Sequence, residues 1–224
     1  MNPPHVYYSQ LYRNFRAIEP VEYRKIVYFY ERHESAIKLL DFSEYFELLN
    51  AYTKALFEIE AHQKHLLMAD VLIELSFEEN IVEINGQEIF QATLFRKAAS
   101  FYHLQQFPKA IYVLNELIKI DPKNTEVAHF LERCLRKSRP KLVRTTRAIA
   151  IFIFLTTAFL ISIEALFVRP FFPIWVFLVE SIRNTAFVSG TFMLGFGEFI
   201  QFLKARHEVL GVVKNAKKPK LGAS

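Results

Sequence analysis

One uninterrupted apolar run constrains the fold of this chain more than any other feature. Residues 148–168 read AIAIFIFLTTAFLISIEALFV, with Glu164 as the single charged side chain. A helix rises about 1.5 Å per residue, so the run is long enough to cross a hydrocarbon core about 30 Å thick. A helix this apolar on every side would otherwise need a large protein around it, and a chain of 224 residues is too short to provide one. The run therefore predicts a membrane-spanning helix, which Arg169 and Pro170 close.

A second apolar stretch follows and is less regular. Residues 171–179 are apolar but too short to cross a bilayer alone, and polar residues separate them from residues 185–203, TAFVSGTFMLGFGEFIQFL. The favoured interpretation is a second crossing over residues 184–204, with the preceding segment and its Trp175 at the membrane interface, where tryptophan is favoured. Two alternatives remain open: a single long tilted helix over about residues 173–205, and an amphipathic helix that lies on the membrane surface.

The charge of the chain is divided as sharply as its hydropathy. Residues 1–132 hold 13 Lys and Arg against 19 Asp and Glu, and residues 133–224 hold 15 against 4. A net charge of −6 is therefore followed by a net charge of +11. The positive excess lies beside the apolar runs, so anionic lipid headgroups are the expected partner, and no nucleic-acid binding is predicted.

Basic residues flank the two apolar stretches. Seven lie within residues 133–147 and six within residues 204–220, whereas Arg169 and Arg183 are the two that lie between. Because Lys and Arg concentrate in cytoplasmic flanks, this pattern predicts a transmembrane hairpin with both chain termini in the cytoplasm. A bacterial inner membrane is favoured, and a eukaryotic organelle remains open. The N-terminal residues show no signal-peptide pattern, and the one cysteine, Cys134, excludes an intrachain disulfide.

A helical pattern occupies the region before the apolar runs. Residues 91–124 read QATLFRKAASFYHLQQFPKAIYVLNELIKIDPKN, in which apolar residues recur at helical spacing in two blocks. Ala98 and Ala110 are small enough for the two predicted helices to cross closely. Pro122 is expected to end the second helix, because proline cannot continue the hydrogen-bond ladder.

This stretch of 34 residues resembles a tetratricopeptide repeat, or TPR. The family places small residues, aromatic residues and a proline at fixed positions, which here are occupied by Ala98, Phe101, Phe107, Ala110 and Pro122. The sequence departs from the family pattern at Leu94 and Lys97.

A second copy lies upstream at an offset of 45 residues. Residues 52–73 align with residues 97–118, and apolar positions coincide along most of the alignment. His65 takes the place of Ala110, a change expected to loosen that helix crossing. The offset exceeds the 34-residue repeat, so we expect an insertion near residues 79–89, where Asn85-Gly86 predicts a turn.

These patterns predict an all-α fold, in which a TPR-like solenoid of helix hairpins precedes a transmembrane helical hairpin. The expected organisation is an N-terminal helical cap or degenerate repeat (1–41), a TPR-like domain (42–137), a basic juxtamembrane linker (138–147), a transmembrane hairpin (148–204) and a basic C-terminal tail (205–224).

The resemblance implies a protein-binding scaffold in which the first helix of each pair lines a concave groove. By the alignment, the expected partner-binding residues are Asn50, Lys54, Phe57, Phe95, Arg96, Ala99, Tyr102, His103, His129 and Arg133. The basic residues among them are suited to a partner's carboxylates. The sequence lacks the five-residue carboxylate clamp of family members that bind chaperone tails, so that ligand is not expected.

No constellation of catalytic residues stands out. None of the six glycines belongs to a phosphate-binding loop, and no nucleophile elbow is present. His62 and His65 can share a helix face, but a metal site needs at least one more ligand. The sequence therefore predicts neither an enzyme nor a bound metal or cofactor.

Ionisable residues in or near the apolar stretches are a stronger functional lead, because charges are costly there. The candidates are Glu164, Glu180, Arg183 and Glu198. A hairpin would bring Glu164 close to Arg183, and would leave Glu198 within reach of Lys204.

Two functional hypotheses follow from the sequence. The first is a membrane-anchored adaptor whose TPR-like domain binds a partner protein on the cytoplasmic side. The second is a small membrane subunit of an oligomeric channel, transport or motor complex, with the TPR-like domain as a docking or regulatory module. Thr191 and Gly195, at a small-xxx-small spacing, would allow close helix approach within the hairpin or in a homo- or hetero-oligomer.

Overall fold

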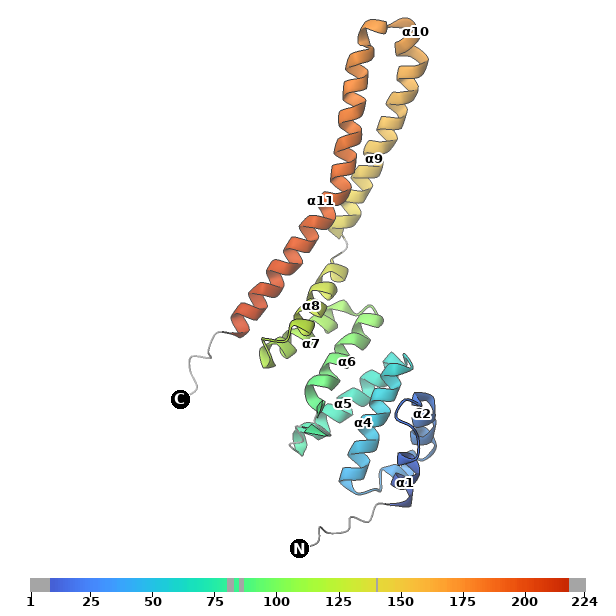
Figure 1. The fold of residues 1–224 in the computed structure, drawn as a ribbon, viewed down its shortest axis with the longest axis vertical. Coiled ribbons are helices and arrows are strands. Elements are labelled where there is room, and N and C mark those ends of the chain that lie inside the picture. Colours follow the sequence, from blue (N-terminus) through green and yellow to red (C-terminus); the bar gives the residue numbers. More distant parts are fainter. Residues whose placement is uncertain (1–8, 80–82, 85–86, 140, 218–224) are drawn as a thin grey trace. The chain divides into compact units, whose positions relative to one another are not determined.

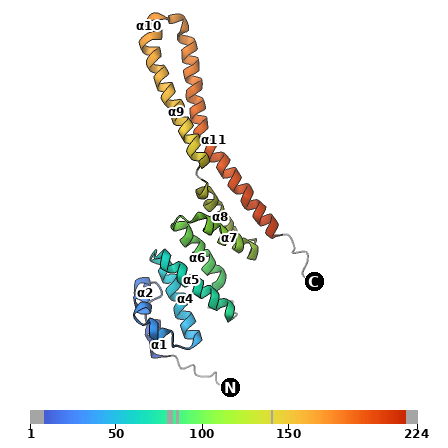
Figure 2. The same ribbon diagram turned by 180° about the vertical axis from the view of Figure 1, so that it is seen from behind.

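The computed structural model describes residues 9–79, 83–84, 87–139 and 141–217, and its fold is all-α, as predicted (Figures 1 and 2). The chain divides into two compact units, Met1–Leu131 and Glu132–Ser224. The boundary falls inside a helix rather than in the linker expected at residues 138–147.

Three helices open the first unit: α1 (Gln10–Arg16), α2 (Tyr23–Arg32) and α3 (Glu34–Ile37). Ser9 caps α1, because its Oγ accepts a hydrogen bond from the backbone N–H of Tyr12 at 3.1 Å. The apolar faces of α1 and α2 pack on α4 (Phe42–Glu58), where the Tyr30 and Tyr52 rings stack with centroids 4.0 Å apart. The described part of residues 1–41, expected to be an N-terminal helical cap or degenerate repeat, thus forms these three short helices.

Two helix pairs follow, and each helix packs on the next one along the chain. The first pair is α4 and α5 (His62–Glu78), and the second is α6 (Ile89–His103) and α7 (Phe107–Ile120). Pro122 lies just beyond the end of α7, as predicted. Asn124 then caps α8 (Thr125–Ser138), because its Oδ1 accepts hydrogen bonds from two backbone N–H groups at 3.1 and 3.2 Å.

The turns inside the two helix pairs share one backbone geometry. Glu60 and Gln105 both adopt the left-handed conformation, with φ of 61° and 59°. The residue after each donates its backbone N–H to a carbonyl five residues earlier, at 2.9 and 2.8 Å. This is the Schellman arrangement of a helix end. Its two copies stand 45 residues apart, which is the offset found by aligning the sequence with itself, so the helix packing is repeated.

Small residues build the crossing of α6 and α7. Ala98 and Ala110 are both fully buried. His65, which aligns with Ala110, is also fully buried, and its Nδ1 lies 2.9 Å from the hydroxyl of Ser100 on α6. The imidazole is therefore directed into the contact between the two helix pairs.

The insertion expected near residues 79–89 contains two short strands, β1 (Glu83–Ile84) and β2 (Gln87–Glu88). They pair antiparallel, with Glu83 opposite Glu88. The predicted Asn85-Gly86 turn lies outside the described residues.

The second unit contains a helical hairpin. Its first arm is α9 (Lys141–Ile163), which continues through the π-helical turn η1 (Glu164–Val168) into α10 (Arg169–Phe171). The 3-10 turn η2 (Pro173–Trp175) leads into the second arm, α11 (Val176–Ala216). The two arms pack side by side (Figures 1 and 2). Both are long and apolar enough to cross a membrane, over Val143–Phe171 and Pro173–Ala216.

Three expected boundaries in this unit differ from the structure. Residues 141–147, expected in a linker, form the first turns of α9. The second crossing expected over residues 184–204 is part of a continuous helix of 41 residues, so the alternative of one long helix describes α11 better. The tail expected from residue 205 is helical to Ala216. Lys, Arg and Glu are good helix formers, and no proline stands within residues 174–218, so the change from apolar to basic sequence does not end the helix.

Candidate functional site

The predicted partner-binding residues are accessible. Each of the ten is at least partly exposed, whereas the other faces of α4 and α6 supply buried residues such as Leu49, Leu56 and Ala98. Nine of the ten lie in the first unit, on α4, α6 and α8. The tenth, Arg133, lies one turn after His129 on α8.

Six side chains form an aromatic strip across α4, α5, α6 and α8. They are, in spatial order, Phe57, His62, His103, Tyr102, Phe130 and Phe95. Neighbouring rings lie 4.5 to 6.0 Å apart between centroids, and all six side chains are partly exposed. The sequence prediction contained four of them and missed His62 and Phe130. Both lie on helices other than α4 and α6, and helix packing brings them into line.

A recess of about 240 Å³ opens beside the strip. It is lined by α6, α7, α8 and the turn before α8, and Phe95, Arg96, Asp121 and Glu126 contribute to it. Burial lowers the pKa of Arg96, and the nearby Glu58 opposes that effect. Arg96 nevertheless forms no ion pair with any residue that the structure describes. A partly buried guanidinium in this state is suited to a carboxylate from another molecule.

Two histidines meet one buried serine beneath the strip. The Ser100 hydroxyl lies 2.9 Å from His65 Nδ1 and 3.2 Å from His62 Nδ1. Burial, with Arg96 as the next cause, lowers the pKa of His65 to about 4, so the imidazole is neutral at pH 7. Burial and then His103 lower the pKa of His62. Ser100 is fully buried, so it is not open to a substrate as a nucleophile.

The closed end of the hairpin holds an ion cluster of four side chains. Glu164 is 2% exposed and pairs with Arg169 at 2.9 Å and with Arg183 at 2.7 Å. Glu180 pairs with Arg169 at 3.2 Å. The predicted approach of Glu164 to Arg183 is therefore present, and Arg169 joins it. Two carboxylates balance two guanidinium groups, which reduces the cost of placing these charges in apolar surroundings.

Glu198 lies apart from the ion cluster. It pairs with Arg147 on α9 at 2.5 Å, rather than with Lys204 as expected. Residues six apart on a helix point about 120° away from each other, so Lys204 faces a different direction. The partner of Glu198 therefore comes from the neighbouring helix.

Small residues of α11 divide between two faces. A Cβ atom on Gly197 would overlap the Thr146 side chain of α9, and one on Gly190 would lie 3.1 Å from the nearest α9 side chain. Close approach inside the hairpin therefore depends on Gly190 and Gly197. Gly195 borders open space and Thr191 is exposed, so the predicted small-xxx-small pair faces away from α9.

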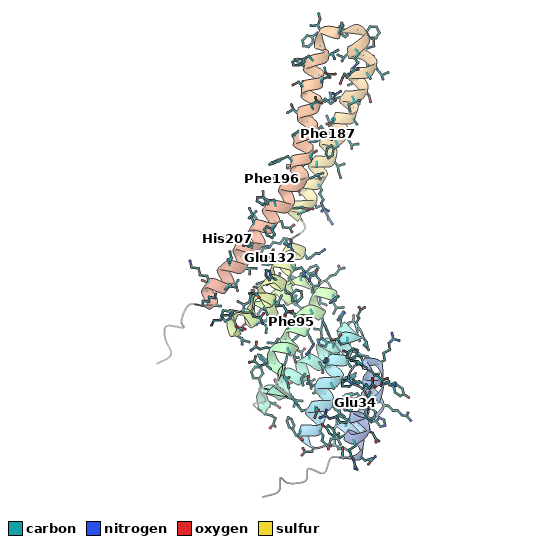
Figure 3. All side chains as sticks on the ribbon, in the orientation of Figure 1. Glu34, Phe95, Glu132, Phe187, Phe196 and His207 are labelled. Atoms are coloured by element: carbon teal, nitrogen blue, oxygen red, sulfur yellow. The ribbon has the colours of Figure 1, made fainter. Side chains whose placement is uncertain are left out.

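Apolar side chains cover the outside of the hairpin. Large exposed apolar residues recur along both arms, and Figure 3 labels Phe187 and Phe196 among them on α11. Only 17% of the apolar window in the first arm and 11% of that in the second are buried. Neither helix is therefore the buried core of the described unit, and this surface is of the kind that contacts lipid or another protein.

Among the described residues, no three His, Cys, Asp or Glu side chains are grouped so as to hold a metal ion. Comparisons with known protein families, curated proteins and solved structures find no match for this chain.

Proposed function

We propose that the chain is a membrane-anchored adaptor without catalytic activity of its own. In this proposal a TPR-like domain binds a partner protein on the cytoplasmic side, and the helical hairpin holds the complex at the bilayer. The observation that carries the proposal is the aromatic strip. It presents six partly exposed rings on a scaffold of repeated helix pairs, in the same chain as two helices apolar enough to cross a membrane.

The chemistry of the strip indicates what kind of segment it would bind. Partly exposed aromatic rings give large contact areas at low entropy cost, and such residues dominate binding energy at protein interfaces. Arg96 adds an unpaired cation beside them, and Lys54 is exposed on α4. A partner segment with apolar side chains and a nearby carboxylate would match this surface.

The membrane part of the proposal rests on the hairpin. Its outward apolar surface is suited to lipid, and both basic flanks belong to the end opposite the ion cluster. The positive-inside rule then favours both chain termini in the cytoplasm, and a bacterial inner membrane is the proposed location. With Cys134→Ala as background, Phe172→Cys is expected to react with an impermeant thiol reagent outside intact cells. Labelling that appears only after lysis would contradict this topology.

A photo-crosslinking phenylalanine analogue tests the binding surface. We expect the analogue at Tyr102, in the aromatic strip, to capture one specific protein in native membranes. The matched control carries the analogue at Tyr112, which is 67% exposed on α7 and outside the strip. Equal capture from both positions, or no specific capture at Tyr102, would count against the adaptor.

The outward small-residue face supports a second candidate function. Gly195 and Thr191 are open on the hairpin surface, so another membrane helix could pack there, as in a subunit of an oligomeric channel, transport or motor complex. Under this alternative, Glu164→Gln or Glu198→Gln would abolish function while crosslinking at Tyr102 persists. Under the adaptor proposal, loss of crosslinking at Tyr102 and loss of function would occur together.

A further inference from the structure

We propose that the end of α11 beyond the apolar span binds the headgroup of an anionic glycerophospholipid. The site is a recess of about 720 Å³ formed by Arg139 and by six residues of α11 between Leu203 and Leu210. Figure 3 labels His207, which belongs to this stretch. The inference rests on the membrane attachment in the proposed function, and it adds a specific ligand class and location.

Specific contacts hold the wall of this recess in place. The guanidinium of Arg139 donates two hydrogen bonds to the Glu208 carboxylate, at 2.9 and 3.3 Å. Gln201 Nε2 donates to the carbonyl oxygens of Arg136 and Arg139, at 2.6 and 2.9 Å. The Arg136 guanidinium lies over the Phe202 ring, 5.9 Å from its centroid. The segment around Arg139 is therefore tied to α11 by side-chain contacts.

These contacts leave the recess with uncompensated positive charge. Glu208 is the acidic residue that lines it, and Arg139 neutralises that carboxylate. Lys204 and Arg206 also line the recess, and neither forms an ion pair with any described residue. Two cations that form no ion pair with any described residue thus contribute to the lining of one recess, and such groups are suited to a phosphodiester.

The recess begins at the outer side of the headgroup layer. We place the Arg147–Glu198 pair at the hydrocarbon boundary, because ionisable groups are costly deeper in the bilayer. Lys204 follows Glu198 by six residues, or about 9 Å along the helix axis. The headgroup layer is roughly 5 to 8 Å thick on each side.

Helix geometry closes the remaining gap. Side chains in a helix lean toward its N-terminus, which for α11 is the direction of the membrane span. The long side chains of Lys204 and Arg206 therefore lean back toward the phosphates instead of away from them.

Apolar side chains make a lipid the favoured source of the phosphate. Leu203 is 47% exposed and Leu210 is 58% exposed, and both line the recess with the cations. A soluble phosphate or an acidic peptide would gain nothing from an exposed Leu203 on the membrane side of Lys204. A glycerophospholipid places its glycerol toward Leu203, on the membrane side of the recess, and its phosphate beside the cations.

Native mass spectrometry of the full-length protein tests the site. The protein is reconstituted in nanodiscs of phosphatidylcholine with phosphatidylglycerol, released into mild detergent, and its bound lipids are counted. Lys204→Gln with Arg206→Gln should lower phosphatidylglycerol affinity about 25-fold, at about fivefold per basic residue near a membrane surface. The matched control is Lys214→Gln with Lys217→Gln, which removes two cations at the C-terminal end of α11 that do not line the recess. It should leave affinity within about twofold, because the distant charges are screened.

Each outcome of this experiment is decisive. Equal losses in both double variants would overturn the site, because they would show general charge attraction. Equal retention of phosphatidylcholine and phosphatidylglycerol by the unaltered protein would also overturn it, while leaving the membrane anchor intact. Displacement of the lipid by millimolar inorganic phosphate would show that the recess binds free phosphate, and would overturn the lipid assignment. Release of the protein from native membranes by alkaline carbonate would refute the anchor itself, and the lipid site with it.

Discussion

The buried imidazole of His65 makes the stability of the first unit depend on pH. Its pKa is about 4 in the folded chain, and an unfolded chain returns it to the ordinary value near 6.5. Between these values the unfolded state binds a proton that the folded state does not. Stability from this group is therefore complete above pH 6.5 and is lost as the pH falls toward 4. One pKa unit corresponds to about 1.4 kcal/mol, so the loss amounts to roughly 3 kcal/mol.

The substitution His65→Leu isolates this effect. Leucine fills similar space, binds no proton, and removes the imidazole Nε2, which has no hydrogen-bond partner among the described residues. Ser100 loses its hydrogen bond to His65, worth about 1 kcal/mol, and keeps its contact with His62 at 3.2 Å. The lost hydrogen bond and the removed unpaired nitrogen oppose each other, so stability at pH 7 should change by about 1 kcal/mol or less. Between pH 7 and pH 4, however, the unaltered protein should lose about 3 kcal/mol more than the variant.

Hydrogen exchange measured by mass spectrometry provides the assay. The full-length protein in detergent is followed at a series of pH values, and the protection of α5 and α6 amides is corrected for the intrinsic exchange rate. His129→Gln serves as the control, because it removes an exposed histidine of α8 from the same unit. If the unaltered protein and His65→Leu lose equal protection between pH 7 and pH 4, the buried histidine is not the source of the pH dependence.

Three further substitutions test the turn, the hairpin packing and the ion cluster. Glu60→Gly should raise the free energy of unfolding of the first unit by about 1 kcal/mol in urea, because glycine adopts the left-handed backbone without strain; a loss of stability would contradict this. Gly197→Leu should lower the thermal stability of the hairpin in detergent, whereas Gly195→Leu, beside open space, should leave it nearly unchanged; equal effects would refute the inward role of the first glycine. Glu164→Gln should destabilise the hairpin by about 2 kcal/mol, because it removes the buried carboxylate that pairs with Arg169 and Arg183, and Glu180→Gln, at a more exposed carboxylate, should have a smaller effect in the same measurement.

The repeat was predictable from the sequence because its signal is carried by local side chains. Apolar spacing and small residues set the self-alignment at 45 residues, and the left-handed turns at Glu60 and Gln105 recur at that offset. The role of His65 was not predictable in the same way. Its position marks a buried site, but its partner, Ser100, is 35 residues away and belongs to the next helix pair. A hydrogen bond between separate helix pairs leaves no periodic trace in one sequence.

The hairpin contained a signal that the sequence interpretation did not use. Residues that face each other across a hairpin lie about equally far from its turn along the chain, so the midpoints of all such pairs fall at nearly the same place. The midpoint of the predicted pair of Glu164 with Arg183 falls within residues 172–174. The midpoint of Arg147 and Glu198 falls within the same residues. The partner of Glu198 is therefore identified by the register of the two arms, and not by its closeness to Lys204 along α11. The end of α11 was harder to predict, because basic residues mark a change of environment without breaking a helix.

The pairing of charges at the two ends of the hairpin gives a physical reason for its proposed orientation. Residues 164–183, at the closed end, hold two carboxylates and two guanidinium groups, all of them paired in the ion cluster. Moving this end through a bilayer therefore transfers no net charge. The opposite end differs, because Lys204 and Arg206 have no acidic partner among the described residues. The free-energy cost of insertion is lower when the neutral closed end crosses the bilayer and the unpaired cations stay on the side of entry. Charge pairing therefore favours the same orientation as the count of basic residues.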